Sequence, residues 1–268
     1  MNIYEYMSVG EYEKPLDRIV TDGGFCSIFR RIGCIGDSLS SGEFESKDAE
    51  GNRGFHDYYE YSWGQFIARS AGCEVLNFSK GGMTAKRYME EFAESKGFWA
   101  EDKICQAYII AFGVNDLLGH KQEVGTLADI NKDDYTKNAP TFAGYYAQII
   151  QRLKSMQPRA KFFLVGMPRQ GDENDEKRAQ HRDILKQMAE FFDRTYFIDL
   201  FTYAPEYNAE FKKKYFLGHM TPTGYIVSAR IIESYIDYII RKNPKDFAQV
   251  GFIGTDLYYE SEEKSYNE

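Results

Sequence analysis

Short apolar runs alternate with amphipathic segments along most of the chain. Five runs are apolar enough to be buried strands, at residues 31–35, 74–78, 107–112, 162–165 and 196–200. Because helical periodicity separates these runs, the pattern predicts repeated strand–helix units. Such units build a parallel sheet with helices on both of its faces. We therefore expect an α/β protein with a five-stranded parallel sheet.

The helical segments carry clear periodicity. Apolar side chains recur at i, i+3 and i+4 spacing over 142–156 and again over 184–192. The last helix is expected to begin at Thr221 and Pro222, a capping residue followed by proline at the first helical position. It should continue through Ile240.

One sheet of five strands uses nearly the whole chain, so we predict a single domain over residues 1–268. Three segments fall outside the alternation. They are an N-terminal extension at 1–27, a polar insertion at 117–140 that would suit a lid, and a C-terminal tail at 243–268 that ends in acidic sequence.

Composition and charge narrow the function classes. The 268 residues are 43% hydrophobic and 28% charged, which is ordinary for a globular protein. The net charge of −8, with scattered lysine and arginine, argues against nucleic-acid binding. Apolar runs stay below the ~18 residues of a membrane span, and the first ten residues lack a secretory pattern. We therefore expect a cytoplasmic protein with no membrane span.

Candidate chemistry follows the strands, because ligands on such sheets bind at the carboxyl ends of the strands. Ser38 comes directly after the first strand, and His219 precedes the last helix. Asn115 and Gly82 follow two other strands and would supply an amide side chain and an unobstructed backbone N–H. A serine needs a base to become a nucleophile, and its oxyanion needs fixed donors. The topology brings all four residues to one rim.

Four short motifs resemble the sequence blocks of the SGNH hydrolases. The sequence Gly-Asp-Ser-Leu at 36–39 matches the GDSL block, and Gly82 matches the glycine of the second block. Gly-Val-Asn-Asp at 113–116 matches the third block, and His219 matches the final histidine. The resemblance covers residues 31–240 roughly, with the blocks in the expected order.

This resemblance implies a flavodoxin-like three-layer α/β/α sandwich and hydrolysis of a small-molecule ester through an acyl-enzyme. It implies that Ser38 is the nucleophile and His219 the general base. The backbone N–H groups of Ser38 and Gly82 and the side chain of Asn115 would form the oxyanion hole. No cofactor is implied.

The chain departs from the family at one position. The family usually carries an aspartate three residues before its histidine, and this chain has Phe216 there. Two replacements are possible: a backbone carbonyl near Phe216 or Leu217, which would make a Ser-His dyad, or Asp199 at the end of the fifth strand. We favour the dyad. Asp37, Asp116 and Asp199 are the residues predicted to support the site.

Other catalytic motifs are excluded. The fifth position of a G-x-S-x-G elbow is occupied by Ser40, which argues against an α/β-hydrolase lipase. His181 has no histidine partner four residues away, and a calcium-like start at 129–133 lacks the later turn glycine and glutamate. We predict no metal site.

The substrate is less constrained. His56 and Tyr58, in an aromatic cluster after the Ser38 loop, are candidates for the rim of the substrate pocket. Because the sequence lacks a long apolar stretch for a fatty acyl chain, we expect short acyl groups, with an acylated sugar as one candidate.

Alternatives come from the same family and from another class. Within the family, a lysophospholipase or a thioesterase fits the same motifs. The other class is a non-catalytic flavodoxin-like module that binds a small molecule, in which Ser38 and its neighbouring serines cradle a phosphate. That interpretation leaves Asn115 and His219 unexplained. A hydrolase that has lost turnover is a third alternative, motivated by Phe216.

Overall fold

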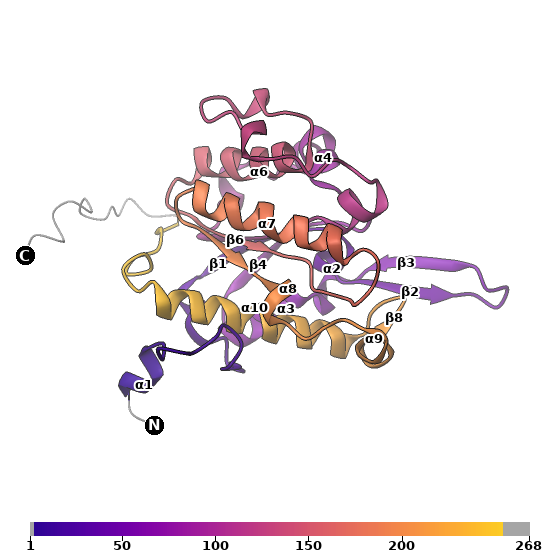
Figure 1. Cartoon of the computed structure of the whole chain (residues 1–268), viewed down its shortest axis with the longest axis horizontal. Coiled ribbons are helices and arrows are strands. Elements are labelled where there is room, and N and C mark those ends of the chain that lie inside the picture. Colours follow the sequence, from indigo (N-terminus) through magenta and orange to yellow (C-terminus); the bar gives the residue numbers. More distant parts are fainter. Residues whose placement is uncertain (1–2, 254–268) are drawn as a thin grey trace, which may run out of the picture.

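A five-stranded parallel sheet forms the centre of the protein, in the order β4-β1-β5-β6-β7 (Figure 1). The computed structural model describes residues 3–253. The strands are β1 (Arg31–Gly36), β4 (Glu74–Ser79), β5 (Ala107–Ala111), β6 (Lys161–Val165) and β7 (Thr195–Ile198). The predicted strands are confirmed, with ends that shift by one or two residues.

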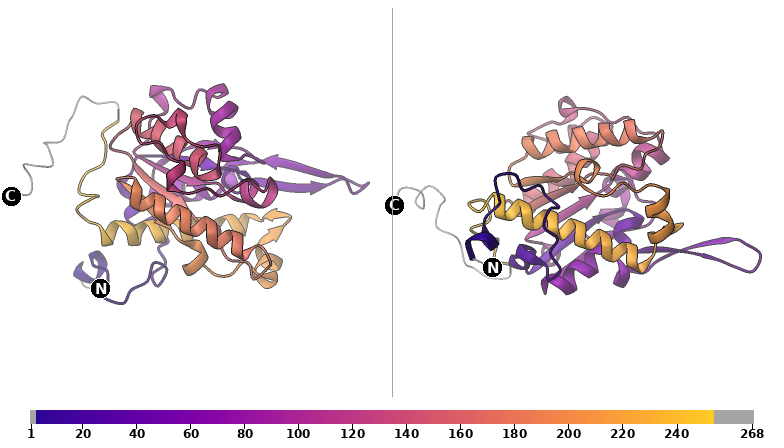
Figure 2. Two further views of the ribbon diagram at one scale, coloured as in Figure 1. Left: turned by 45° about the horizontal axis from the view of Figure 1, so that its top comes forward. Right: turned by 60° about the horizontal axis from the view of Figure 1, so that its bottom comes forward.

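Helices cover both faces of this sheet, which confirms the three-layer α/β/α fold (Figures 1 and 2). One core layer packs under α6 (Phe142–Met156) and α7 (Asp175–Phe191). The other packs under α3 (Trp63–Ala71) and α10 (Pro222–Lys242). The Thr221 hydroxyl caps α10 by accepting from the Gly224 N–H at 3.2 Å, as the sequence predicted for this helix start.

Short helices join the main elements. They are α1 (Ile3–Met7), α2 (Ser38–Ser41), α4 (Ala85–Arg87), α5 (Ala93–Ser95), α8 (Leu200–Tyr203) and α9 (Ala209–Tyr215). Single turns of 3-10 or π geometry occur at Gly24–Ile28, Tyr59–Tyr61, Tyr88–Phe92, Glu101–Lys103, Val114–Gly119, Leu127–Asp129 and Tyr135–Lys137.

A two-stranded antiparallel hairpin, β2 (Glu43–Lys47) and β3 (Arg53–Asp57), projects from the body of the protein (Figures 1 and 2). The sequence did not predict it, because neither strand carries the apolar run of a buried strand. Phe44 alone in β2 is hydrophobic, and it packs against the core layer under α10. A second pair, β8 (Phe216–Leu217) and β9 (His219–Met220), lies next to β2.

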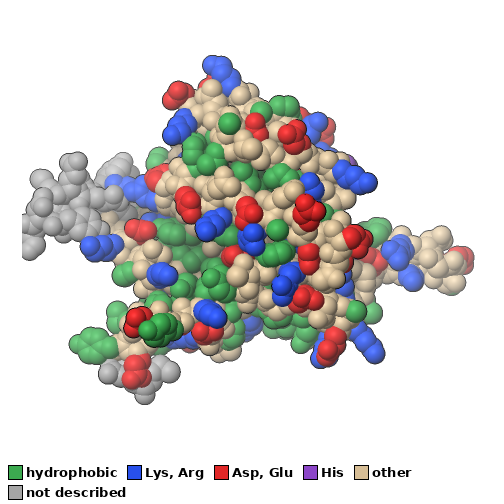
Figure 3. Space-filling view, in the orientation of Figure 1, with side chains coloured by type: hydrophobic (Ala, Val, Ile, Leu, Met, Phe, Trp, Pro, Cys, Tyr) green, Lys and Arg blue, Asp and Glu red, His purple; other side chains and the backbone are tan. Residues whose placement is uncertain are grey.

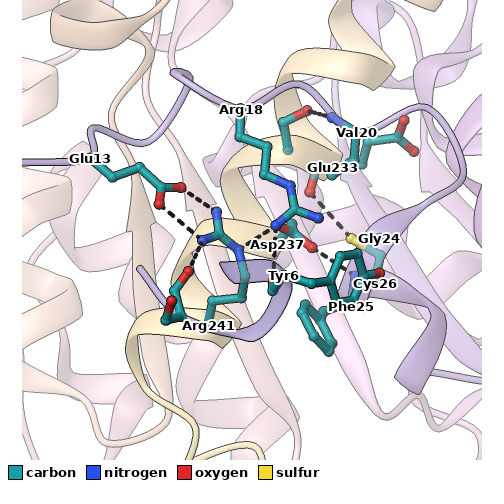
Figure 4. A network of polar contacts seen from close by, with 12 residues as sticks. Tyr6, Glu13, Arg18, Val20, Gly24, Phe25, Cys26, Glu233, Asp237 and Arg241 are labelled. Atoms are coloured by element: carbon teal, nitrogen blue, oxygen red, sulfur yellow. Dashed lines mark hydrogen bonds and ion pairs between the residues drawn. The ribbon is translucent and has the colours of Figure 1, made fainter. Parts of the chain in front are cut away.

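The N-terminal extension is fastened to α10 by polar contacts (Figure 4). The guanidinium of Arg241 binds both Glu13 and Asp237. Asp237 in turn accepts the backbone N–H of Phe25 at 2.9 Å. Because Arg241 and Asp237 are almost fully buried, these paired charges hold the extension in one place on the helix.

The insertion at 117–140 packs on α6. The side chain of Asn138 donates to the Gly144 carbonyl at 3.1 Å and to Gln151 at 2.8 Å. None of these insertion residues lines the cavity described below, so the structure offers no support for the predicted lid. The acidic end of the predicted C-terminal tail, residues 254–268, lies outside the described residues.

The surface carries both signs of charge. In Figure 3, lysine and arginine side chains are interspersed with acidic ones rather than gathered into a stripe. No helix within the described range combines the length and the apolar character that crossing a bilayer requires.

Candidate active site

Ser38 stands at the carboxyl edge of the sheet, as the first residue of α2. The helix begins there because the Asp37 carboxylate accepts the Leu39 N–H at 3.1 Å and so caps it. The Tyr225 hydroxyl donates to the Glu43 carbonyl at 2.7 Å and reaches the Ser38 carbonyl at 3.5 Å. These contacts fix the loop that presents the Ser38 side chain.

A cavity of about 620 Å³ opens at this edge. Ser38, Asn115 and His219 all line it, so three remote chain segments meet there as the sequence motifs predicted. Gly82 lies outside its lining in the described structure, at a backbone φ of 69° where a glycine is favoured.

His219 lies between two glutamates of the hairpin. Its Nδ1 is 2.9 Å from Glu45 Oε1, and its Nε2 is 3.0 Å from Glu43 Oε1. Glu43 and Glu45 share one face of β2 because side chains alternate along a strand. Each imidazole nitrogen therefore lies within hydrogen-bond distance of a carboxyl oxygen.

Two glycines make room for these glutamates. A side chain at Gly218, where φ is 77°, would overlap the Glu45 carboxylate. A side chain at Gly81 would overlap Glu43 Oε2. The close approach of His219 to the hairpin therefore depends on glycine at both positions.

Glu43, the glutamate next to Nε2, has a raised pKa. Burial raises the pKa of Glu43, and the nearby Asp57 and Glu45 raise it further, whereas His219 lowers it. Asp57 belongs to the base of the hairpin, where it accepts the Ser41 hydroxyl and the Gly81 N–H. The hairpin is thus tied to the Ser38 helix and to the loop after β4.

Asn115 is held by the loop that contains Gly82. Its side-chain amide donates to the Met83 carbonyl at 3.1 Å, and the next residue, Asp116, accepts the Ala85 N–H at 2.8 Å. Burial raises the pKa of Asp116 to about 6 and that of Asp37 to about 7. The second and third sequence blocks are therefore joined by direct hydrogen bonds.

A family model described as the GDSL-like lipase/acylhydrolase family matches residues 34–227. The chain belongs to this family. The match includes the Ser38, Gly82, Asn115 and His219 motifs, and it confirms the resemblance seen in the sequence. The protein is an ester hydrolase of the GDSL type. A search of curated proteins returns no match.

Solved structures share the fold of this GDSL-type hydrolase at low identity. A family two carbohydrate esterase from Clostridium thermocellum in complex with cellohexaose is 17% identical, with a TM-score of 0.54, over 81% of this chain and 65% of its own. A family 2 carbohydrate esterase from Corynascus thermopiles, which carries a carbohydrate-binding domain, is 16% identical, with a TM-score of 0.55, over 79% and 66%. The chain thus spans about two thirds of these two proteins.

A third structure covers nearly its whole length. The Clostridium thermocellum family 3 carbohydrate esterase is 16% identical, with a TM-score of 0.51, over 79% of this chain and 97% of its own. At such identities the likeness shows the fold.

The partner of His219 Nδ1 differs from both expectations. Neither a backbone carbonyl near Phe216 nor Asp199 occupies that position, because Glu45 reaches it from the hairpin. Asp199 instead caps α8, where it accepts the Thr202 N–H at 3.0 Å. Phe216 pairs with Met220 in the β8–β9 ribbon. No local motif points to Glu45, because it lies 174 positions before the histidine in the chain.

The two residues predicted at the pocket rim lie on the other side of the hairpin. His56 pairs with Phe44 across the strands, and its Nε2 is 2.8 Å from the Ser46 hydroxyl. Tyr58 is exposed and packs edge-on against Phe44. Among the described residues, neither is part of the cavity lining. Their role in substrate binding stays a prediction.

A residue that the sequence did not single out for this role, His181, supports the Asn115 loop. It is fully buried on α7, with Nε2 2.9 Å from the Phe112 carbonyl and Nδ1 accepting the Met167 N–H at 3.3 Å. It thereby joins the ends of β5 and β6. Burial lowers the pKa of His181 to about 4, so this imidazole is neutral at pH 7.

Proposed function

We propose that this GDSL-type hydrolase cleaves carboxylic esters through an acyl-enzyme on Ser38. One observation carries the proposal: Ser38, Asn115 and His219 line one cavity at the carboxyl edge of the sheet. A nucleophile, a base and an amide donor that converge on a single cavity are the parts that acyl transfer needs.

The reaction follows from these groups. His219 Nε2 takes the proton of the Ser38 hydroxyl as its oxygen bonds to the ester carbonyl carbon. The Asn115 side chain, with the backbone N–H groups of Ser38 and Gly82, stabilises the oxyanion. The alcohol then leaves with the proton from His219. A water molecule, activated by the same imidazole, frees the carboxylic acid and restores Ser38.

Glu45 acts as the acid partner of His219, the role that an aspartate three residues before the histidine usually has in this family. An acid at Nδ1 fixes the imidazole tautomer and stabilises the imidazolium that forms when the serine proton is taken. Glu45 Oε1 at 2.9 Å from Nδ1 meets this requirement, which favours a Ser38–His219–Glu45 triad over a dyad. Asp37 and Asp116 support the site through the helix cap and the Ala85 contact.

Glu43 competes with Ser38 for the other nitrogen. Its carboxyl group holds Nε2 at 3.0 Å, and this nitrogen has to be released before it can accept the serine proton. Contacts of this kind commonly rearrange when substrate binds. An entering ester would bring Ser38 and Nε2 together at the expense of the Glu43 contact.

The alcohol part of the ester leaves at the open side of the cavity. Phe55 of β3 lies outside the cavity lining but next to His219: it is exposed, and its ring is edge-on to the imidazole with centroids 5.9 Å apart. An exposed aromatic face suits stacking on a sugar ring. The three solved structures described above are carbohydrate esterases of the same fold, so we propose an acylated sugar as the substrate to test first.

Covalent labelling tests the nucleophile directly. A fluorophosphonate probe should label the wild type on the peptide that contains Ser38, and Ser38→Ala should lose the label. Ser38→Ala and His219→Ala should each lower kcat for p-nitrophenyl acetate by about a thousandfold or more. Ser95→Ala, at an exposed serine remote from the cavity lining, is the matched control and should keep both label and rate. Labelling that persists in Ser38→Ala would refute the assignment.

A further inference from the structure

The cavity at Ser38 continues into the protein between the sheet and α10. Its inner part is lined by Val165 of β6, Leu200 of α8, Trp63 of α3, and Ile231 and Ile232 of α10. All of these residues are buried members of the core layer under α10. The opening at Ser38 is thus connected to a hydrocarbon-lined space within the core.

This space is deep. Ile232 follows the first residue of α10, Pro222, by ten positions, which corresponds to about 15 Å along the helix axis at ~1.5 Å per residue. His219 and Ser38 stand near the start of that helix, at the carboxyl edge of the sheet. A linear group attached at Ser38 therefore has room to extend along α10 toward Ile232.

Polarity changes along the cavity. The residues with charged or amide side chains come from segments near the opening, and include Asn115, Gln170, Lys212 and His219. The buried polar side chains of the lining are those of Asp37, next to Ser38, and of Ser228 and Tyr207, and the Ser228 hydroxyl already donates to Met220 Sδ at 3.3 Å. The inner part thus offers mainly dispersion contacts and apolar burial.

We propose that this inner space binds the acyl chain of the substrate, and that the preferred acyl group is of medium length, roughly six to ten carbons. The inference rests on the proposed acylation of Ser38, which places the ester carbonyl at the opening. The chain runs inward along α10, and the alcohol stays outside next to Phe55. The acyl group is then longer than the sequence predicted.

A series of p-nitrophenyl esters from acetate to dodecanoate tests the chain length. Each methylene that enters the apolar space should raise kcat/KM by about fourfold until the space is full. Octanoate has six more methylenes than acetate, so we expect it to exceed acetate by about a thousandfold or more, with a decline beyond about ten carbons. A rate that is highest with acetate and falls with each added carbon would overturn the proposal.

Filling the space should remove this preference. In Ile232→Phe the larger side chain occupies the inner cavity, so kcat/KM for octanoate should fall by about tenfold while acetate stays within about threefold. The matched control is Ile226→Phe, the same change at an exposed position of the same helix. Should melting show that Ile232→Phe does not fold, Leu200→Phe fills the space from another element. Equal loss for both esters would count against the proposal.

Binding separates this proposal from the proposed function. Octanoate should raise the melting temperature of Ser38→Ala, acetate at the same concentration should not, and Ile232→Phe in that background should abolish the shift. Stabilisation by octanoate without hydrolysis in the wild type would leave the acyl site standing and reject the esterase. Labelling of Ser38 without stabilisation by octanoate would support the esterase and reject the acyl site.

Discussion

Glu45 Oε1 lies 2.9 Å from Nδ1 of His219, although 174 positions separate the two residues in the chain. The acid partner of the imidazole thus comes from β2 rather than from the position three residues before the histidine, where Phe216 stands. The following predictions depend on this contact and on its neighbours.

Glu45→Gln should lower kcat for p-nitrophenyl esters by about a hundredfold or more with little change in KM. The amide keeps the size of the side chain but loses the charge that stabilises the imidazolium. Stopped-flow measurement of the acylation burst gives the affected step. Glu50→Gln, the same change at the exposed hairpin turn, is the control. Partial recovery in Glu45→Asp supports a positioning role, and unchanged kcat in Glu45→Gln would rule it out.

Gly218→Ala should reproduce the kcat loss of Glu45→Gln, since the added methyl group would overlap the Glu45 carboxylate and drive it from His219. The strain of a side chain at a φ of 77° also contributes to instability. Gly51→Ala controls for that strain, because Gly51 has a φ of 87° with open space around it. Activity and melting temperature are measured for both variants. Similar losses of activity in the two would attribute the effect to strain alone.

Glu43→Gln should move the acidic limb of the pH profile of kcat/KM to lower pH. Burial raises the pKa of Glu43, and its protonated carboxyl group donates to Nε2, which then cannot accept the Ser38 proton. The glutamine removes this titration. The profile is measured from pH 4 to 9 with a p-nitrophenyl ester. An acidic limb that moves to higher pH, or stays in place, would contradict competition between Glu43 and Ser38 for Nε2.

Asp116→Asn should gain stability relative to the wild type as the pH rises from 4.5 to 8. Burial raises the pKa of Asp116 to about 6, from an ordinary 3.8, so its neutral form is favoured in the folded state. Protonated Asp116 therefore stabilises the folded state fully below about pH 4, and this stabilisation, roughly 3 kcal/mol, is lost as the pH rises through 6. His181 has the opposite effect. Burial lowers its pKa to about 4, so the stability that its neutral form contributes is lost as the pH falls from 6.5.

Urea denaturation of wild type and Asp116→Asn at pH 4.5 and 8 isolates the aspartate, because the His181 contribution cancels in the difference. The difference in the free energy of unfolding, variant minus wild type, should be more positive at pH 8 than at pH 4.5. The asparagine retains an oxygen that accepts the Ala85 N–H, so the fold is preserved. A difference that does not vary with pH would disprove the raised pKa.

The sheet could be predicted from the sequence because its strands are short, continuous apolar runs that lie buried on both faces. Ser38, Asn115 and His219 follow from local motifs at the ends of elements, and the parallel topology brings such ends to one edge. The hairpin that carries Glu45 has no such run, and its pairing with His219 is a contact across the fold. The inner cavity was also missed, because its lining is assembled one or two residues at a time from four elements, β6, α3, α8 and α10.

The hairpin leaves the body of the protein as an arm, so the acid and the nucleophile of this site stand on parts that can change separately. Ser38 begins α2 directly after a strand of the sheet, whereas Glu45 depends on a ribbon whose length and tip are free to vary without disturbing the core. A change toward the tip of that ribbon would retune the histidine and leave the serine and the inner apolar space as they are. The arm thus lets catalytic strength evolve independently of the acyl chain that the core accommodates.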